Sequence, residues 1–344
     1  MKAWRERGRG GDVDRDKLAA LREAGIDLDP EATHGHDHGD GTALDHAHPH
    51  QHSAPGEPPL IGIVGAGAVG SALGLALTRA GWPIQAVASR DPARRERFRE
   101  LVGGTRAFEE ITPLVDEVEL IILAVPDDVI ASVARGIRLY SGQALIHTSG
   151  ALGAEVLQPA MAAGTQVGSF HPLVAFADTA RAVEALQGAT IAVEGDNQLV
   201  ALLSEMATAI GARAVRLAPG TKAAYHAAAV LAAGGFVALL DAIAELGRVA
   251  GLDETGSLAI YGPLIEQTLG NARALGIRAA LTGPLTRGDV GTLESHLAAL
   301  AAHAPDVLPL YRAAAIREIA LAEERGALTP DVSGRLRTAL ANTP

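Results

Sequence analysis

Residues 60–70 read LIGIVGAGAVG, and this stretch decides the fold. The first half is a short apolar run, typical of a buried β-strand, and a G-x-G-x-x-G pattern and an apolar helix at 71–80 follow it. In such a unit the glycines permit a tight turn, let the backbone approach a pyrophosphate, and let helix and strand pack closely. The free N–H groups of the helix N-terminus then face the anion. We therefore predict a dinucleotide site, with a purely structural turn as the alternative. Its turn comprises Gly65, Ala66, Gly67, Ala68, Val69 and Gly70.

Strands and helices continue to alternate beyond this turn. Apolar runs predict strands at 84–89, 120–125, 144–147, 166–169 and 190–193, and a helix is expected at 92–101. Such strands, separated by helices, indicate a parallel sheet covered on both faces. After about residue 217 only Ala/Leu-rich helices are expected, the first at 221–246, with breaks at Gly251, Gly262-Pro263, Gly283-Pro284 and Pro305.

These patterns predict three regions. Residues 1–58 are charged, rich in glycine and histidine, and poor in large apolar side chains, so we expect a disordered tail there. Residues 59–217 should form an α/β domain, a Rossmann-type doubly wound parallel sheet. Residues 218–344 should form an all-α C-terminal domain.

Composition narrows the class of protein. The chain is 48% hydrophobic, contains no cysteine, and carries a formal net charge of −11. The negative charge argues against a nucleic-acid partner. The longest apolar run, at 227–240, falls short of the about 20 residues that a membrane span needs, so no membrane partner is expected. The lack of cysteine excludes disulfides and fits a reducing, cytoplasmic location.

The end of the second strand favours one nicotinamide cofactor over another. An acidic residue there would bind the ribose 2′-hydroxyl of NAD, whereas this strand ends in Ser89 and Arg90. Arg90 can pair with a 2′-phosphate, so we predict NADP(H) in preference to NAD(H). Asp91 would be the acid if the register shifted by one or two residues, but it precedes Pro92 and suits a helix N-cap better. Val125 and Pro126 lie at the end of a later strand and should run beside the cofactor.

Four further motifs point to a family. They are HTSG at 147–150, GSFHPL at 168–173, KAAYH at 222–226 and LTGPLTRGD at 281–289. With the glycine turn, they resemble Rossmann-like proteins that carry the C-terminal domain DUF2520. This group is similar to the 6-phosphogluconate dehydrogenase-like superfamily, which includes β-hydroxyacid dehydrogenases, ketopantoate reductases and pyrroline-5-carboxylate reductases. The resemblance covers about residues 60–340.

The resemblance implies an oxidoreductase that forms a homodimer through its helical domain. It implies a small carboxylate substrate, and a keto acid such as ketopantoate is the first expectation. An imine reductase of the pyrroline-5-carboxylate type and a non-catalytic NADP-binding sensor are the alternatives. The segment at 232–235 (AAGG) departs from the family, in which an asparagine is usual there, so a polar substrate contact is absent from it.

Lys222 and His226 are the first catalytic candidates. They are spaced i, i+4 on a predicted helix and so share a face. Reduction of a ketone needs a proton for the developing alkoxide, and a lysine ammonium can supply it and stabilise the charge. Lys222 matches the lysine of β-hydroxyacid dehydrogenases, and His226 stands where their asparagine would be. Either side chain could be the acid, and a surface lysine at a helix start is the structural alternative.

Other candidates follow the ends of strands or lie in loops. His171 could donate a proton or bind substrate, or it could satisfy a backbone carbonyl. Thr148, Ser149 and Gly150 could bind a carboxylate or cap the next element. Arg287 could reach a substrate carboxylate or pair with Asp289.

The N-terminal region carries a cluster of histidines. Alternate imidazoles can bind a divalent metal loosely, although the spacing is not that of a fixed tetrahedral site. A solvated tail is the alternative interpretation. The histidines are His34, His36, His38, His46, His48, His50 and His52.

Overall fold

The computed structural model describes residues 53, 57–162, 164–218 and 220–342. The seven tail histidines, and with them the predicted metal binding, lie outside the described residues. The described chain divides into two compact units, one ending at Ala229 and one beginning at Val230. Lys222 therefore belongs to the unit with the sheet.

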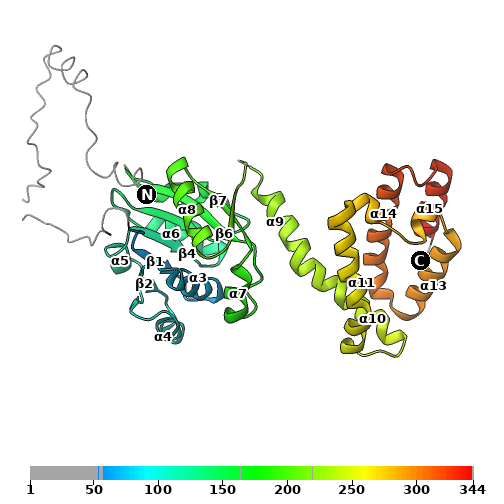
Figure 1. Cartoon of the computed structure of the whole chain (residues 1–344), viewed down its shortest axis with the longest axis horizontal. Helices are drawn as coiled ribbons and strands as arrows, with labels where there is room; N and C mark the ends of the chain where they lie inside the picture. The colour runs from blue at the N-terminus through cyan, green and yellow to red at the C-terminus, as the bar shows by residue number, and fades with distance from the viewer. Residues whose placement is uncertain (1–52, 54–56, 163, 219, 343–344) are drawn as a thin grey trace, which may run out of the picture. The chain divides into compact units, whose positions relative to one another are not determined.

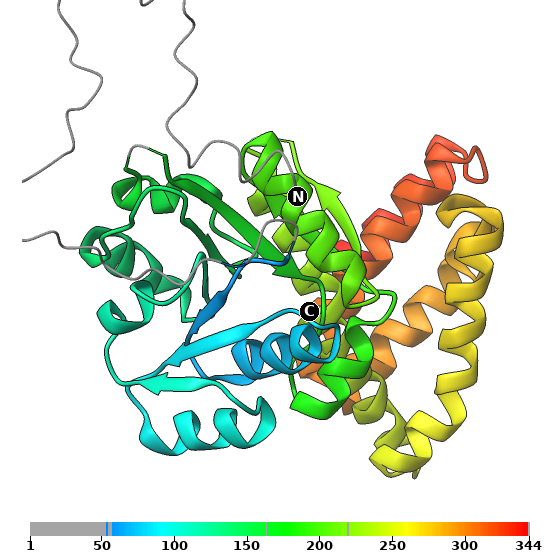
Figure 2. The ribbon, with the colours of Figure 1, turned by 60° about the vertical axis from the view of Figure 1, so that its left-hand side comes forward.

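An eight-stranded sheet forms the centre of the first unit (Figures 1 and 2). Its order is β3-β2-β1-β4-β5-β6-β7-β8, with the reversal beside β1 that defines a dinucleotide-binding crevice. All neighbouring strands are parallel except β6 and β7. The strands are β1 (Ile61–Val64), β2 (Ile84–Ala88), β3 (Arg106–Phe108), β4 (Leu120–Leu123), β5 (Ala144–His147), β6 (Gln166–Pro172), β7 (Thr190–Glu194) and β8 (Arg213–Arg216). The predicted Rossmann-type fold is confirmed.

Alternating side chains of the central strands bury both faces of the sheet. Ile61 and Ile63 of β1 join one apolar core, and Val64 joins the other. The first core includes α3 (Ala68–Arg79), α7 (Thr179–Leu186) and α8 (Asn197–Ala209). The second includes α5 (Thr112–Val115) and α6 (Asp127–Gly136). Helices on both faces explain why these strands are apolar throughout.

Two strands were not predicted, and one strand runs in an unexpected direction. The edge strands β3 and β8 were not expected, because RAF and RAVR are short and partly exposed and so lack an apolar run. We expected a parallel sheet throughout, but β7 runs antiparallel to β6. The helix expected at 92–101 is α4 (Pro92–Leu101), and Asp91 caps it by accepting hydrogen bonds from the backbone of Ala93 and Arg94.

The second unit is helical, as predicted. Its core is formed by Leu293 and Leu297 of α13 (Val290–His303), Ile319 of α14 (Leu308–Glu324) and Leu336 of α15 (Pro330–Asn342). The remaining elements are α10 (Phe236–Val249), α11 (Glu254–Leu275), α12 (Ile277–Ala280) and the short turns η3 (Leu285–Arg287) and η4 (Pro305–Val307). The break expected at Gly262-Pro263 is wrong, since α11 continues through Pro263. One proline removes a single helical hydrogen bond, and here the turns on either side continue the helix.

The expected helix at 221–246 is α9 (Lys222–Val230), a π-helical turn, η2 (Leu231–Gly235), and then α10. Together they form one helix, Lys222–Val249, which by length and composition alone could cross a membrane. That evidence is weak, since a helix that packs in a soluble protein can pass the same test. Its first turn carries Lys222, Tyr225 and His226, whose contacts are described below, and the expectation of no membrane partner stays a prediction.

Candidate functional site

The glycine turn between β1 and α3 has the geometry that a dinucleotide needs. Gly65 has φ +107°, a conformation that favours glycine, and a Cβ there would overlap the carbonyl oxygen of Ala124. A Cβ on Gly70 would overlap the carbonyl oxygen of Gly65, so helix and turn pack without space for a side chain. A Cβ on Gly67 would meet only open space. Gly67 is also the N-cap of α3. It has no side chain that could accept hydrogen bonds from the N–H groups of the first turn, so these groups can bind an anion.

Three arginines lie just after β2, and one of them makes no ion pair with any described residue. The carboxylate of Asp91 caps α4 and pairs with Arg94 at 3.3 Å, so it is not available to a ribose hydroxyl. Arg95 bonds the carbonyl oxygen of Ser89 and lies 3.7 Å from Glu109. Arg90 is exposed and makes no ion pair among the described residues. This arrangement fits a 2′-phosphate better than a ribose 2′-hydroxyl.

The segment after β4 lies against the glycine turn. Ala124 donates its N–H to the carbonyl oxygen of Val64, and the side chain of Val125 is 3.2 Å from the position that a Cβ on Gly65 would take. Pro126 is the N-cap of α6. The N-cap position makes no side-chain hydrogen bond, and the first residue of the helix is Asp127. Its carboxylate instead acts electrostatically on Lys222 and His171, which connects this segment to the cluster described next.

Lys222 is buried in an ion pair against the neighbouring strands β6 and β7. Only 4% of the residue is exposed, so the surface-lysine alternative is wrong. Its Nζ lies 2.6 Å from Oε2 of Glu194 and 2.5 Å from Oγ of Ser169. The Ser169 hydroxyl also donates to Oε2 of Glu194 at 2.6 Å. Ser169 and Glu194 are direct partners across the antiparallel β6–β7 pair, so the reversal of β7 builds this three-residue cluster.

The ion pair adjusts the pKa values of both partners. Burial lowers the pKa of Lys222, and the carboxylate of Glu194 opposes this effect. Burial would raise the pKa of Glu194, but hydrogen bonds from Lys222 and Ser169 outweigh it and lower that pKa. Lys222 and Glu194 therefore favour each other's charged forms.

Two imidazoles lie beside this cluster. The rings of His171 and His226 are 5.9 Å apart, and the ring of Tyr225 meets that of His171 edge-on at 5.7 Å. Nδ1 of His171, Nδ1 of His226 and the Tyr225 hydroxyl are buried without a hydrogen-bond partner among the described residues. Burial, followed by the charge of Lys222, lowers the pKa of His171 to about 4, so this imidazole is neutral at pH 7. The three unpartnered atoms are free to bind a polar ligand.

The HTSG segment surrounds the imidazoles with backbone. Gly150 lies against both rings, because a Cβ there would be 2.6 Å from Nε2 of His171 and would overlap Nδ1 of His226. The Ser149 hydroxyl accepts from the N–H groups of Ala151 and Leu152, and the Thr148 hydroxyl donates to the carbonyl oxygen of Leu123. Both hydroxyls are thus engaged by backbone groups. Neither caps the next element, η1 (Ala154–Ala160), whose N-cap is Gly153 and has no side-chain cap.

Arg287 lies in the second unit, in the turn η3, and is exposed. The expected pairing of Arg287 with Asp289 is not formed as an ion pair. Asp289 instead caps α13, where its carboxylate accepts from the N–H and the hydroxyl of Thr292.

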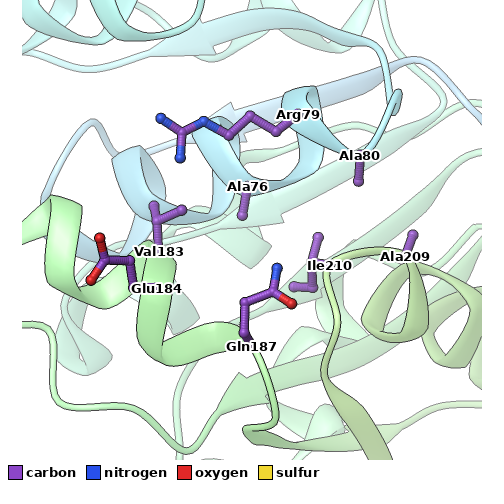
Figure 3. A pocket seen from close by; sticks show the side chains of 8 residues that line it. All are labelled: Ala76, Arg79, Ala80, Val183, Glu184, Gln187, Ala209 and Ile210. Atoms are coloured by element: carbon purple, nitrogen blue, oxygen red, sulfur yellow. The ribbon is translucent and has the colours of Figure 1, made fainter.

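A separate hollow of about 220 Å³ lies between α3, α7 and α8 (Figure 3). Arg79, Glu184 and Gln187 are its polar lining residues, and none of the predicted site residues lines it. Among the described residues, no group of three or more histidine or acidic side chains is arranged to hold a metal.

Sequence reasoning missed Glu194, and it named Ser169 and Tyr225 only within motifs. Glu194 ends a strand whose direction could not be read from its apolar residues. Tyr225 lies one residue before His226 on the same turn of α9, which was the available signal.

Two family models match parts of the chain. The Rossmann-like domain matches residues 49–172, and the domain of unknown function DUF2520 matches residues 189–317. The chain is thus a Rossmann-like protein with a C-terminal DUF2520 domain. The resemblance given by the sequence motifs is confirmed. A comparison with curated proteins finds no match.

Solved structures share the fold. A protein from Bacteroides fragilis, named as a candidate NADP oxidoreductase, is 24% identical with a TM-score of 0.64, over 76% of this chain and 98% of its own. A reductive aminase from Aspergillus terreus, in complex with NADPH and ethyl-5-oxohexanoate, is 19% identical with a TM-score of 0.59, over 82% and 99%. A 1-pyrroline-5-carboxylate reductase from Streptococcus pyogenes is 16% identical with a TM-score of 0.55, over 83% and 98%.

Proposed function

We propose that this protein is an NADP(H)-dependent oxidoreductase that reduces the carbonyl group of a small molecule. A keto acid such as ketopantoate is the first substrate to test. The observation that carries the proposal is Lys222, which is buried in an ion pair with Glu194. Nδ1 of His171 and Nδ1 of His226 lie beside it with no hydrogen-bond partner in the described part of the chain, and Asp127, next to the glycine turn, acts on its pKa. A buried cation is the group that a developing alkoxide requires.

The cofactor part of the proposal rests on three features. A Cβ on Gly67 would meet only open space, which leaves room for a pyrophosphate, and Asp91 is engaged as a cap. Arg90 has no ion-pair partner in the part of the chain that the structure describes. The structural neighbours whose names include NADP or NADPH support the same choice. The bound cofactor would supply the hydride.

The proton would come from Lys222. As hydride reaches the carbonyl carbon, the C=O π pair moves to oxygen, and that oxygen takes a proton from the ammonium. His171 cannot be the acid near pH 7, because its pKa of about 4 leaves it neutral. His171 and His226 would instead orient the substrate through hydrogen bonds, since an atom of each ring is unpartnered.

Reduction of a C=N bond is the second candidate. A buried lysine on its own would repel a cationic imine, but Glu194 compensates the charge of Lys222 and removes this objection. The names of two structural neighbours, a pyrroline-5-carboxylate reductase and a reductive aminase, favour the same candidate. A sensor that binds NADP without turnover remains the third.

A substrate panel tests these candidates. The purified protein is mixed with NADPH or NADH and with ketopantoate, glyoxylate or pyrroline-5-carboxylate, and the nicotinamide absorbance is followed. We expect NADPH oxidation with a keto acid and a loss of roughly 10²-fold or more in Lys222→Ala. Turnover with the imine alone would favour the second candidate. Binding of NADPH with no turnover of any substrate would favour the sensor.

A further inference from the structure

We propose that Glu194 is a positioning residue that keeps Lys222 charged and aligned in its buried site and returns a proton to it after each turnover. The inference deepens the proposed reductase function and rests on it for the chemistry. Its structural part, control of the charge of Lys222, can be tested without turnover.

The first argument is the choice of residue. Lys2, Lys17 and Lys222 are the only lysines in the sequence, so the surface cations of the described chain are arginines. The one lysine among the described residues is buried rather than solvated. An ammonium can release its proton when burial lowers its pKa, whereas a guanidinium stays charged.

The second argument is the geometry of the pair. Two of the three Nζ hydrogens are used by Glu194 and Ser169, which fixes the direction of the third. Ser169 is fully buried, and its hydroxyl supports both members of the pair. Because Ser169 and Glu194 are opposite each other in the β6–β7 ladder, backbone pairing holds both acceptors in place.

The third argument is access to solvent. The side chain of Lys222 is 5% exposed and that of Glu194 is 16% exposed. Solvent therefore reaches the carboxylate more readily than the ammonium. After Lys222 gives its proton to the substrate oxygen, Glu194 can take a proton from water and pass it along the 2.6 Å hydrogen bond to the neutral amine. The net reaction consumes the hydride and one solvent proton, and both residues return to their starting charges.

Several other titratable groups face Lys222 and must be considered with Glu194. They come from the elements around the cluster: Asp127 of α6, His147 of β5, Glu155 of η1 (Ala154–Ala160), His171 of β6 and His226 of α9. Asp127 and Glu155 act on the Lys222 pKa in the same direction as Glu194 but more weakly. Burial lowers the pKa values of His147 and His171 to about 4, so these rings stay neutral across the lysine titration.

The test is a direct titration of Lys222. The full chain is labelled with isotope at lysine only, and NMR follows three signals against pH, with Lys2 and Lys17 as internal references. Loss of one signal in Lys222→Arg assigns it. In Glu194→Gln we expect the pKa of Lys222 to fall by roughly one to three units, the range produced by one close opposite charge. Glu184→Gln, which removes an exposed carboxylate of α7, should leave it unchanged.

Activity gives the second measurement. The decline of kcat at high pH should move to lower pH in Glu194→Gln by the same number of units, with KM changed less than kcat. If Glu194→Gln does not fold, Ser169→Ala keeps the carboxylate and removes one ligand of Nζ, and a smaller fall of the Lys222 pKa is expected. An unchanged Lys222 titration in the folded variants would overturn the inference. If the wild type turns over no substrate while the titration shifts as expected, only the proposed function fails.

Discussion

Arg90→Ala tests the cofactor assignment most directly. Arg90 is exposed and makes no ion pair among the described residues, so its replacement breaks no described ion pair and should leave the fold intact. A hydrogen bond between charged groups contributes about 1.5–3 kcal/mol, and solvent exposure places Arg90 near the lower end of this range. At about 1.4 kcal/mol per factor of ten, we expect NADPH to bind roughly tenfold more weakly.

Calorimetry or nucleotide fluorescence can measure the effect with both cofactors. The affinity for NADH should stay unchanged, because NADH has no 2′-phosphate. Arg94→Ala is the matched control: Arg94 lies on the next helix but already pairs with Asp91, so its loss should change NADPH affinity less. If Arg90→Ala weakens NADH and NADPH equally, or neither of them, the assignment of Arg90 to the phosphate is wrong.

Three further predictions concern the imidazoles and the second unit. Gly150→Ala should reduce turnover while NADPH still binds, because its methyl group would overlap both rings; unchanged activity would contradict the site geometry. The pKa of His171 falls from 6.5 to about 4 on folding, so the unfolded state binds more protons between these pH values. The free energy of unfolding should therefore fall as the pH drops from 6.5 to 4. This fall should be less steep in His171→Asn than in the control His303→Asn. We also expect a homodimer, because α10 and α11 expose apolar side chains such as Val237 (64%) and Leu264 (59%). Light scattering should give twice the chain mass at micromolar concentration, and a monomer would contradict this expectation.

The sequence predicted the bounds of helices and strands best where an apolar or helical pattern is contained within one element. The strand at 144–147 and the helix at 92–101 were predicted to the residue, since each is bounded by glycines, prolines or caps. The edge strands β3 and β8 were missed because an edge strand buries little and so needs no apolar run. Lys222, His226 and His171 were all identified as candidates, and the structure brings them together.

What the sequence could not supply was the partner of the lysine. An apolar strand such as 190–193 reads the same in either direction, because side-chain alternation has no polarity along the chain. The direction of β7 is decided by its pairing with β6, and that pairing sets Glu194 opposite Ser169. Because we predicted a uniformly parallel sheet, we could not predict that the carboxylate of Glu194 compensates the charge of Lys222. Because Glu194 compensates the charge of Lys222, that charge does not distinguish ketone reduction from imine reduction. Titration of Lys222 is therefore the measurement that tests how this pairing of β6 and β7 controls the proposed proton donor.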